Sequence, residues 1–239
     1  MSLEEKATAI TTIFGDLIWD APGTVGQFNV AFRIKEYRKL DGVWEQIGYV
    51  VRDMQIIIEN SDNRRPELIL PPDLCVEAGT LIEEIIQGSD PDGDPIKIEV
   101  FGEPMEITTS PATYSPGDGD FQPSPGIVNF EWQTVSNHVR AREYDVRVRI
   151  TDQPRSGPAL VDIKTWRIKV IGPPPVVDQL EQMPGRTVEI NWDPYVCANS
   201  ANEMQVWRRI NSDPYEPDSC ETGIRAGYEP IGTTDMETF

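Results

Sequence analysis

The sequence predicts an all-β protein, and two observations support this prediction. The chain has 239 residues with 21 prolines and 18 glycines spread along it, a density of turn-forming residues that favours many short strands over long helices. Apolar residues also alternate with polar ones, as in "FNVAFRI" (28–34) and "YDVRVRI" (144–150). Period-two alternation is typical of strands that bury one face.

The alternating stretches belong to an internal repeat of residues 17–58 and 129–171. The matched positions are Trp19 with Trp132, the set Phe28, Val30, Phe32 and Ile34 with Tyr144, Val146, Val148 and Ile150, and the set Met54, Ile56 and Ile58 with Trp166, Ile168 and Val170. The offset of 112–116 residues is close to the length of one immunoglobulin-like sandwich, about 100 residues. The repeat therefore predicts tandem immunoglobulin-like Greek-key β-sandwiches, with Trp132, Tyr144 and Trp166 in a core.

Only one of these modules is expected to be complete. Residues 67–172 contain a full set of predicted strands, whereas residues 1–66 correspond to the C-terminal half of such a module. Residues 173–239, which begin with a proline run, correspond to the first part of a third module. Because half sandwiches leave strand edges and apolar faces open, we expect the two incomplete terminal modules to be covered. They could pack on the central module, on each other or on a neighbouring molecule, and we favour self-association.

Charge and hydropathy limit the partners of the chain. The formal net charge is −19, with a sequence pI near 4.4, so nucleic acid and anionic membrane surfaces would be repelled. No stretch approaches the roughly 18 apolar residues that a membrane span needs. Cations are the natural counterions.

Three aspartates follow one another at alternate positions in "GSDPDGDP". Asp90, Asp92 and Asp94 could converge on a hard cation such as calcium, which takes six to eight oxygen ligands. Asp, Gly and Pro are also the residues of an ordinary sharp turn, and this interpretation stays open. The stretch is not an EF-hand, because Phe101 stands where that loop needs a bidentate glutamate.

The three cysteines predict one disulfide. Cys197 and Cys220 both follow the proline run and bracket the predicted strand "MQVWRRI", so we expect them to be joined and Cys75 to be free. Such a bridge would indicate an oxidising compartment. The alternative is that both are unpaired thiols.

Catalysis has little support in the sequence. The one histidine, His138, lies in a predicted surface loop. There is no Gly-x-Ser-x-Gly elbow and no second histidine to complete a zinc site. We therefore expect a protein without enzymatic activity.

Several stretches resemble known modules. "GSDPDGDPIKIEVFG" with "YDVRVRITD" and "TWRIKV" resembles the cadherin-like immunoglobulin-fold repeats of large bacterial surface proteins, and "VEINWDPY" with "MQVWRRI" resembles the first strands of a fibronectin type III module. The whole chain looks like the multi-module proteins of gliding motility and surface adhesion. The resemblance implies a secreted or cell-surface location and calcium ligands at Asp90, Asp92, Asp94 and Asp152, although the glutamate motif of cadherin sites is missing.

Three functions are compatible with these features. The first is a non-catalytic structural or adhesive segment of a multi-module surface protein, whose protein or glycan ligand the sequence does not specify. The second is a carbohydrate-binding accessory module of a secreted polysaccharide-degrading enzyme, which needs exposed aromatic residues; Trp44, Tyr49 and Tyr114 are the candidates. The third is a spacer that stiffens when it binds calcium.

Overall fold

A computed structural model describes most of the chain after residue 23. The described residues are 24–60, 62–117, 119–185, 187–201, 203–211, 220–221 and 223–234. They form a nearly all-β protein, as predicted, and the chain divides into two compact units, Met1–Asp62 and Asn63–Phe239. No helix in these residues is long and apolar enough to cross a membrane.

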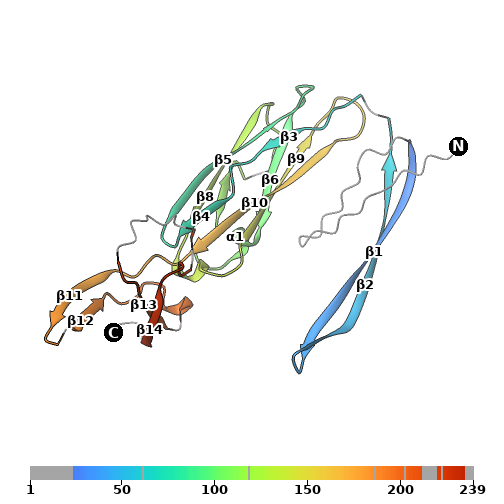
Figure 1. Ribbon diagram of the computed structural model, residues 1–239. Coiled ribbons are helices and arrows are strands. Elements are labelled where there is room, and N and C mark those ends of the chain that lie inside the picture. The colour runs from blue at the N-terminus through green and yellow to red at the C-terminus, as the bar shows by residue number, and fades with distance from the viewer. Residues whose placement is uncertain are drawn as a thin grey trace. The chain divides into compact units, whose positions relative to one another are not determined.

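The first unit contains one long antiparallel hairpin (Figure 1). Strands β1 (Gly26–Leu40) and β2 (Val43–Ile58) are joined at the predicted turn of Asp41 and Gly42. Both turn residues have positive φ, 48° and 86°, which the type I′ turn of a two-residue hairpin requires. The predicted core residue Trp19 lies outside the described residues.

The second unit begins with two four-stranded sheets that pack on each other. One sheet has the order β3-β5-β8-β7, and its strands are β3 (Glu67–Ile69), β5 (Leu81–Ser89), β8 (Gly126–Gln133) and β7 (Thr113–Ser115). The other has the order β4-β10-β9-β6, and its strands are β4 (Leu74–Glu77), β10 (Val161–Ile171), β9 (Tyr144–Asp152) and β6 (Ile96–Gly102). The short helix α1 (Glu103–Glu106) and the 3-10 turn η1 (Ser136–His138) lie in the connections. We call residues 67–171 the sandwich.

The core of the sandwich lies between the two sheets. Trp132, Tyr144 and Trp166 are at most 3% exposed, and the Trp132 and Tyr144 rings meet edge to face at 5.0 Å. Burial of each large apolar side chain contributes about 1.5–3 kcal/mol. Gly88 of β5 permits the close approach of the sheets, because a Cβ there would lie 2.5 Å from the Ile150 side chain.

The chain enters and leaves the sandwich at opposite ends. Glu67 pairs with Ser89 at the start of β3, close to the connection between β5 and β6. Strand β10 starts opposite the end of β9, where Val161 pairs with Thr151, and runs away from that end to Ile171. With 11 residues, β10 spans about 35 Å at roughly 3.3 Å per residue.

The remaining residues form two further hairpins in the same unit. Strands β11 (Val177–Met183) and β12 (Thr187–Trp192) pair antiparallel, as do β13 (Met204–Arg208) and β14 (Glu229–Thr234). The 3-10 turn η2 (Ala198–Ser200) lies between the hairpins in the sequence and contacts η1. These two-stranded pieces follow the completed sandwich.

Candidate functional site: the two junctions of the sandwich

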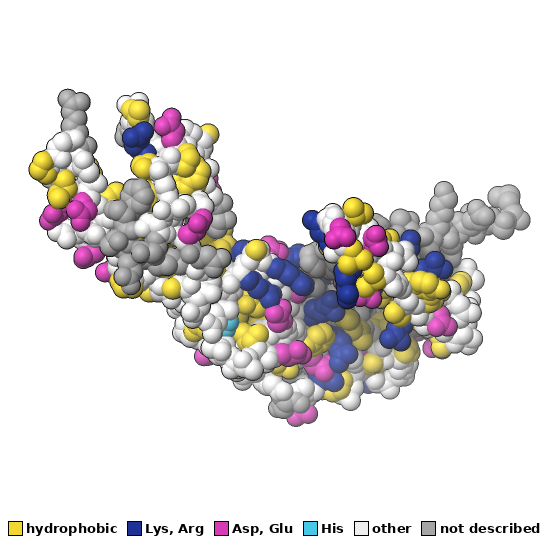
Figure 2. All heavy atoms as spheres, turned by 90° about the horizontal axis from the view of Figure 1, so that it is seen from below, with side chains coloured by type: hydrophobic (Ala, Val, Ile, Leu, Met, Phe, Trp, Pro, Cys, Tyr) yellow, Lys and Arg dark blue, Asp and Glu magenta, His cyan; other side chains and the backbone are white. Residues whose placement is uncertain are grey.

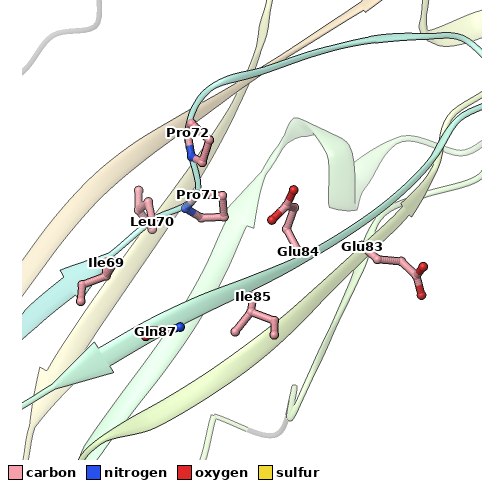
Figure 3. A pocket seen from close by; sticks show the side chains of 8 residues that line it. All are labelled: Ile69, Leu70, Pro71, Pro72, Glu83, Glu84, Ile85 and Gln87. Carbon is pink, nitrogen blue, oxygen red and sulfur yellow. The ribbon is translucent and has the colours of Figure 1, made fainter.

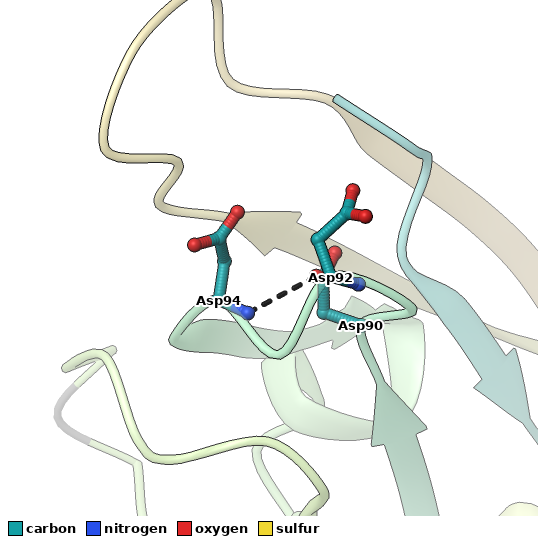
Figure 4. A group of neighbouring side chains, drawn as sticks. All are labelled: Asp90, Asp92 and Asp94. Carbon is teal, nitrogen blue, oxygen red and sulfur yellow. Dashed lines mark hydrogen bonds between the residues drawn. The ribbon is translucent and has the colours of Figure 1, made fainter. Parts of the chain in front are cut away.

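The aspartate loop connects β5 to β6 at the end where the chain enters the sandwich. Its first carboxylate holds the loop in shape, because Asp90 Oδ1 accepts hydrogen bonds from the backbone N–H groups of Asp92 (2.9 Å) and Asp94 (3.1 Å) (Figure 4). Gly93 supplies the positive φ (78°) that the turn requires. The sequence therefore folds locally as an aspartate-stabilised turn.

The three carboxylates converge as predicted for a cation site. Asp90, Asp92 and Asp94 each offer an oxygen atom, and these oxygen atoms lie within 4.8 Å of one another. Asp90 is only 7% exposed, and its Oδ2 atom has no hydrogen-bond partner among the described residues. This buried oxygen, like the convergence of the three carboxylates, favours a bound cation.

Arg64 already neutralises the middle carboxylate. Its backbone N–H donates to Asp92 Oδ2 and its Nε to Asp92 Oδ1, both at 2.7 Å, while its Nη2 donates to the Pro91 carbonyl at 2.6 Å. The backbone and side-chain hydrogen bonds from Arg64 lower the pKa of Asp92. A guanidinium thus contacts the carboxylate that a metal ion would need.

Asp152 belongs to a separate contact at the same end. It is fully buried at the end of β9, and its Oδ1 accepts the Leu160 N–H. Its Oδ2 accepts a hydrogen bond of 2.6 Å from Asn63 Nδ2. Within the described part of the chain, Asp152 does not join the group formed by the other three aspartates.

The carboxylates fit a calcium ion only in part. Calcium takes six to eight oxygen ligands; here Asp92 is bound to Arg64, and both oxygens of Asp152 accept hydrogen bonds. The loop oxygens that remain available as metal ligands are Asp90 Oδ2 and the carboxylate of Asp94. The four predicted ligands therefore do not form one complete site, and two of them anchor residues 63 and 64 instead. We call these contacts the N-terminal latch.

A disulfide at the opposite end of the sandwich joins a different pair of cysteines from the predicted one. Cys75 is bonded to Cys220, and Cys197 is a free, buried thiol, so the predicted Cys197–Cys220 bridge is wrong. Strand β4 runs parallel to the last residues of β10, with Cys75 opposite Lys169. This pairing places Cys75 at the end where the chain leaves the sandwich, within reach of the C-terminal segment.

Hydrogen bonds join the same two parts of the chain. Tyr195 Oη donates to the Pro173 carbonyl at 3.0 Å, across the proline run. Ser136 Oγ donates to the Val196 carbonyl at 3.0 Å, and Ser200 Oγ donates to the Ser136 carbonyl at 3.1 Å. Partial burial raises the pKa of the Tyr195 hydroxyl. The disulfide and these bonds form the C-terminal latch.

His138 is a buried structural residue, contrary to the predicted surface position. It is 2% exposed; its Nδ1 accepts the Val135 N–H at 3.1 Å and its Nε2 lies 2.8 Å from the Thr109 carbonyl. These partners assign the proton to Nε2, because a carbonyl can only accept. The ring also packs on Trp132, with centroids 4.9 Å apart.

Three exposed aromatic residues share one face of the β1–β2 hairpin. Trp44 and Tyr49 are 65% and 59% exposed, and they pair with Lys39 and Lys35 of β1. Directly paired residues lie on the same face, so Tyr37, two residues from each lysine, also lies there. Tyr114, the third candidate for glycan binding, instead packs partly buried against the core of the sandwich.

A shallow groove lies beside β3 and β5. It has a volume of about 370 Å³, and its lining is shown in Figure 3: Ile69, Leu70, Pro71, Pro72, Glu83, Glu84, Ile85 and Gln87. Its lining combines isoleucine, leucine and proline side chains with two glutamates and a glutamine, and contains no serine, cysteine or histidine. The groove offers a contact surface of mixed apolar and acidic character.

Charged side chains of both signs are mixed with hydrophobic ones on the surface visible in Figure 2. On the β6-β9-β10 surface, acids and bases of neighbouring strands pair, as in Arg149 with Glu99 (2.7 Å) and Arg167 with Asp145 (4.0 Å). These side chains are partly exposed, and solvent-screened pairs of this kind contribute about 0–1 kcal/mol each. These ion pairs are typical of a solvated protein surface and do not indicate a binding site.

No model of a protein family matches the chain, and no curated protein matches its sequence. Among solved structures, the sialic acid binding region of a Streptococcus sanguinis SK1 adhesin is similar over 47% of this chain and 31% of its own, with 17% identity and a TM-score of 0.35. The SrpA adhesin of Streptococcus sanguinis is similar over 54% of this chain and 72% of its own, with 17% identity and a TM-score of 0.33.

A nucleoside hydrolase-related hypothetical protein from Saccharophagus degradans, associated with carbohydrate metabolism, is similar over 45% of this chain with 16% identity and a TM-score of 0.32. This chain spans 26% of that protein. All three are likenesses over part of the chain.

Proposed function

We propose that the chain is a non-catalytic structural or adhesive segment of a multi-module protein that is secreted or displayed on a bacterial cell surface. The observation that carries this proposal is the pair of latches at opposite ends of the sandwich. Arg64 and Asn63 fix the incoming chain to the aspartate loop and Asp152, and the Cys75–Cys220 disulfide fixes the outgoing segment. Linkers that are held to the sandwich where the chain enters and leaves it suit a spacer between neighbouring modules, because relative motion of modules is otherwise the default.

Strand order supports an immunoglobulin-like module. The orders β3-β5-β8-β7 and β4-β10-β9-β6 follow the ABED and CFG sheets of that fold, with β4 added beside the last strand. A disulfide in the C-terminal latch supports an oxidising, extracellular location. In the N-terminal latch, the Arg64 guanidinium is the cation that binds the aspartate loop. We propose that calcium, if it binds, does so in addition to Arg64, at Asp90 and Asp94.

Limited proteolysis of the full chain tests the proposed role of the latches. We expect residues 62–66 and 172–176 to resist cleavage, and Arg64→Ala to expose the first junction alone, because it removes every side-chain contact of Arg64 with the loop. Arg65→Ala is the matched control, since Arg65 is exposed and neighbours Arg64 in the sequence. Rapid cleavage of both junctions in the unmodified protein would contradict the proposal.

A carbohydrate-binding function is a second candidate because of the aromatic face of the hairpin. Tyr37, Trp44 and Tyr49 together present aromatic rings beside two lysines, which suits stacking on sugar rings with polar contacts at the edge. A glycan array with the full chain tests it. Glycan binding that is lost in Trp44→Ala and in Tyr49→Ala, but kept in the control Trp207→Ala, would support this function. The absence of binding to any glycan on the array would rule it out.

A further inference from the structure

Charged side chains are unevenly divided between the two faces of the β1–β2 hairpin. Four residues at every second position of β1 share one face: Arg33, Lys35, Tyr37 and Lys39. Trp44 and Tyr49 of β2 lie on the same face, because they pair directly with Lys39 and Lys35. We call these six residues the cationic face.

Among the residues of the two strands, only one carboxylate shares this face. It belongs to Asp53, which pairs with Ala31, two residues before Arg33. The strand residues Glu36 and Glu45 lie on the opposite face, where Arg38 pairs directly with Glu45. Three basic side chains and one acidic side chain leave the face with a formal charge of +2, in a chain whose net charge is −19.

The basic side chains of the cationic face are available to a ligand. Arg33, Lys35 and Lys39 are exposed, and none of them forms an ion pair with a carboxylate of the described residues. The guanidinium carbon of Arg33 lies 4.9 Å from the centroid of the Tyr49 ring, a cation–π contact that holds the side chain against the sheet. A carboxylate that arrives from solvent therefore meets cations without having to displace another acid.

Two aromatic rings lie beside these cations and remain open to stacking. Tyr37 and Trp44 are 49% and 65% exposed. Tyr37 lies between Lys35 and Lys39 in the row, and Trp44 is opposite Lys39. An exposed aromatic ring can pack against the apolar face of a sugar, with polar groups at its edge. Rings and cations thus alternate within a single patch.

The spacing of the row suits a chain of sugars. Arg33 and Lys39 are six residues apart in β1, a distance of about 20 Å at roughly 3.3 Å per residue. The planar fork of an arginine also matches the two oxygens of a carboxylate. The acidic remainder of the chain opposes an anion less than its total charge suggests, because charges farther away than about 8 Å are largely screened at physiological ionic strength.

We propose that the cationic face binds an acidic polysaccharide, whose uronic acid carboxylates contact the three basic side chains and whose sugar rings stack on Tyr37 and Trp44. The inference rests on the carbohydrate-binding candidate function and adds the class of glycan. Single-stranded nucleic acid also combines anions with flat rings. The Cys75–Cys220 disulfide favours the polysaccharide, because it indicates an oxidising compartment outside the cytosol.

Binding of galacturonic acid oligomers to the full chain tests the proposal. The probe is an oligogalacturonate, and its fully methyl-esterified form is the neutral control, since the ester keeps the sugar rings and removes the charge. Calorimetry in calcium-free buffer excludes ion bridges between the oligomer and the aspartate loop. We expect the acidic oligomer to bind at least about tenfold more tightly than the ester, and added salt to reduce this difference.

Two substitutions on the same strand separate the cationic face from the general charge of the hairpin. Arg33→Gln should weaken binding of the acidic oligomer about tenfold, the usual effect of losing one charged hydrogen-bonding partner, and leave binding of the ester unchanged. Arg38→Gln removes the same charge from the opposite face and should change neither affinity. Hydrogen exchange of the β1–β2 amides shows whether each variant still forms the hairpin, and Lys39→Gln takes the place of Arg33→Gln if that variant does not.

Four results would overturn the proposal. Equal affinity for the acid and the ester would do so and would leave the carbohydrate-binding candidate standing. An equal loss in Arg33→Gln and Arg38→Gln would mean that the acid binds through general charge. Tighter binding of a single-stranded oligothymidylate would assign the face to nucleic acid. A salt-sensitive dimer in light scattering that Arg33→Gln dissociates would show that an acidic surface of a second copy covers the face.

The failure of this inference can be told apart from the failure of the proposed functions. No binding of the acidic oligomer would also overturn the inference, and the glycan array alone would then decide on the carbohydrate-binding candidate. The spacer function depends on neither measurement, because proteolysis of the two junctions tests it separately.

Discussion

Arg64 shows how one residue changes the interpretation of a motif. The three aspartates alone indicate a cation site, and their oxygen atoms do lie within 4.8 Å of one another. Arg64 binds the middle carboxylate through its backbone and its guanidinium, so the charge that the loop needs is supplied from within the chain.

We expect the N-terminal latch to depend on pH. The hydrogen bonds from Arg64 lower the pKa of Asp92 below its ordinary value. A lowered pKa contributes stability above the unfolded pKa, and this contribution is lost as the pH falls through the folded value. The protection factor of the Arg64 amide, which is its exchange rate compared with that of an unstructured amide at the same pH, should therefore fall at acid pH, and Asp92→Asn should remove most of this dependence. The same acid response in the variant would contradict this assignment.

Trp166→Ala should destabilise the sandwich by about 3–5 kcal/mol, the usual cost of removing a large aromatic side chain from a core. Trp166 is 1% exposed, and its Nε1 donates to the Pro72 carbonyl at 2.8 Å. Ile163→Ala on the exposed side of the same strand is the control, with an expected change of under about 1 kcal/mol. Urea unfolding measures both, and equal costs would mean that Trp166 is not a core residue.

At the scale of elements, the short strand β4 connects the sandwich to the C-terminal segment. It pairs parallel with the last residues of β10 and thereby places Cys75 at the outgoing end. The partner cysteine is 145 residues away in the sequence. The link joins the sandwich to the region of the β13–β14 hairpin.

Peptide mapping of the unreduced protein should recover Cys75 linked to Cys220. Cys75→Ser and Cys220→Ser should each destabilise the C-terminal segment by about 2–4 kcal/mol, the typical contribution of a disulfide. Cys197→Ala should leave the link intact, because that thiol is free. Recovery of a Cys197–Cys220 peptide would restore the pairing expected from the sequence.

Elements with strong alternation were predictable, and contacts between distant elements were not. The pattern around Tyr144–Ile150 and Trp166–Val170 predicts β9 and β10 and their buried rows, because strand period and core burial are local properties. The Cys75–Cys220 pairing depends on a parallel strand contact that no local pattern encodes. The burial of His138 likewise depends on the Thr109 carbonyl and the Trp132 ring, and the Arg64–Asp92 pair joins residues 28 positions apart.

At the scale of the whole molecule, calcium should have little effect on the unmodified protein. A chain with a net charge of −19 attracts cations generally, but the Arg64 guanidinium occupies the aspartate loop. We expect 1–5 mM calcium, roughly the range of weak extracellular sites, to leave the melting temperature unchanged relative to magnesium. Arg64→Ala should gain a calcium-specific increase, because three neighbouring carboxylates then lack a counter-charge, and Arg65→Ala should not.

A calcium-specific increase in the unmodified protein would show that Asp90 and Asp94 bind the ion beside Arg64. Scattering dimensions measured in the same titration distinguish local binding from stiffening of the junction. If calcium raises the melting temperature but leaves the radius of gyration unchanged, the ion stabilises the aspartate loop and does not stiffen the junction.

The parallel pairing of β4 with β10 has a mechanical consequence. A force that pulls residues 66 and 172 apart draws β4 toward its start and β10 toward its end, so the two strands are driven past each other along their length. The hydrogen bonds between Leu74–Glu77 and Ile168–Ile171 then carry the load in shear, all at once, instead of opening one after another like a zipper. Attachment of Cys220 to Cys75 transmits part of any tension from the C-terminal segment straight into this strand pair.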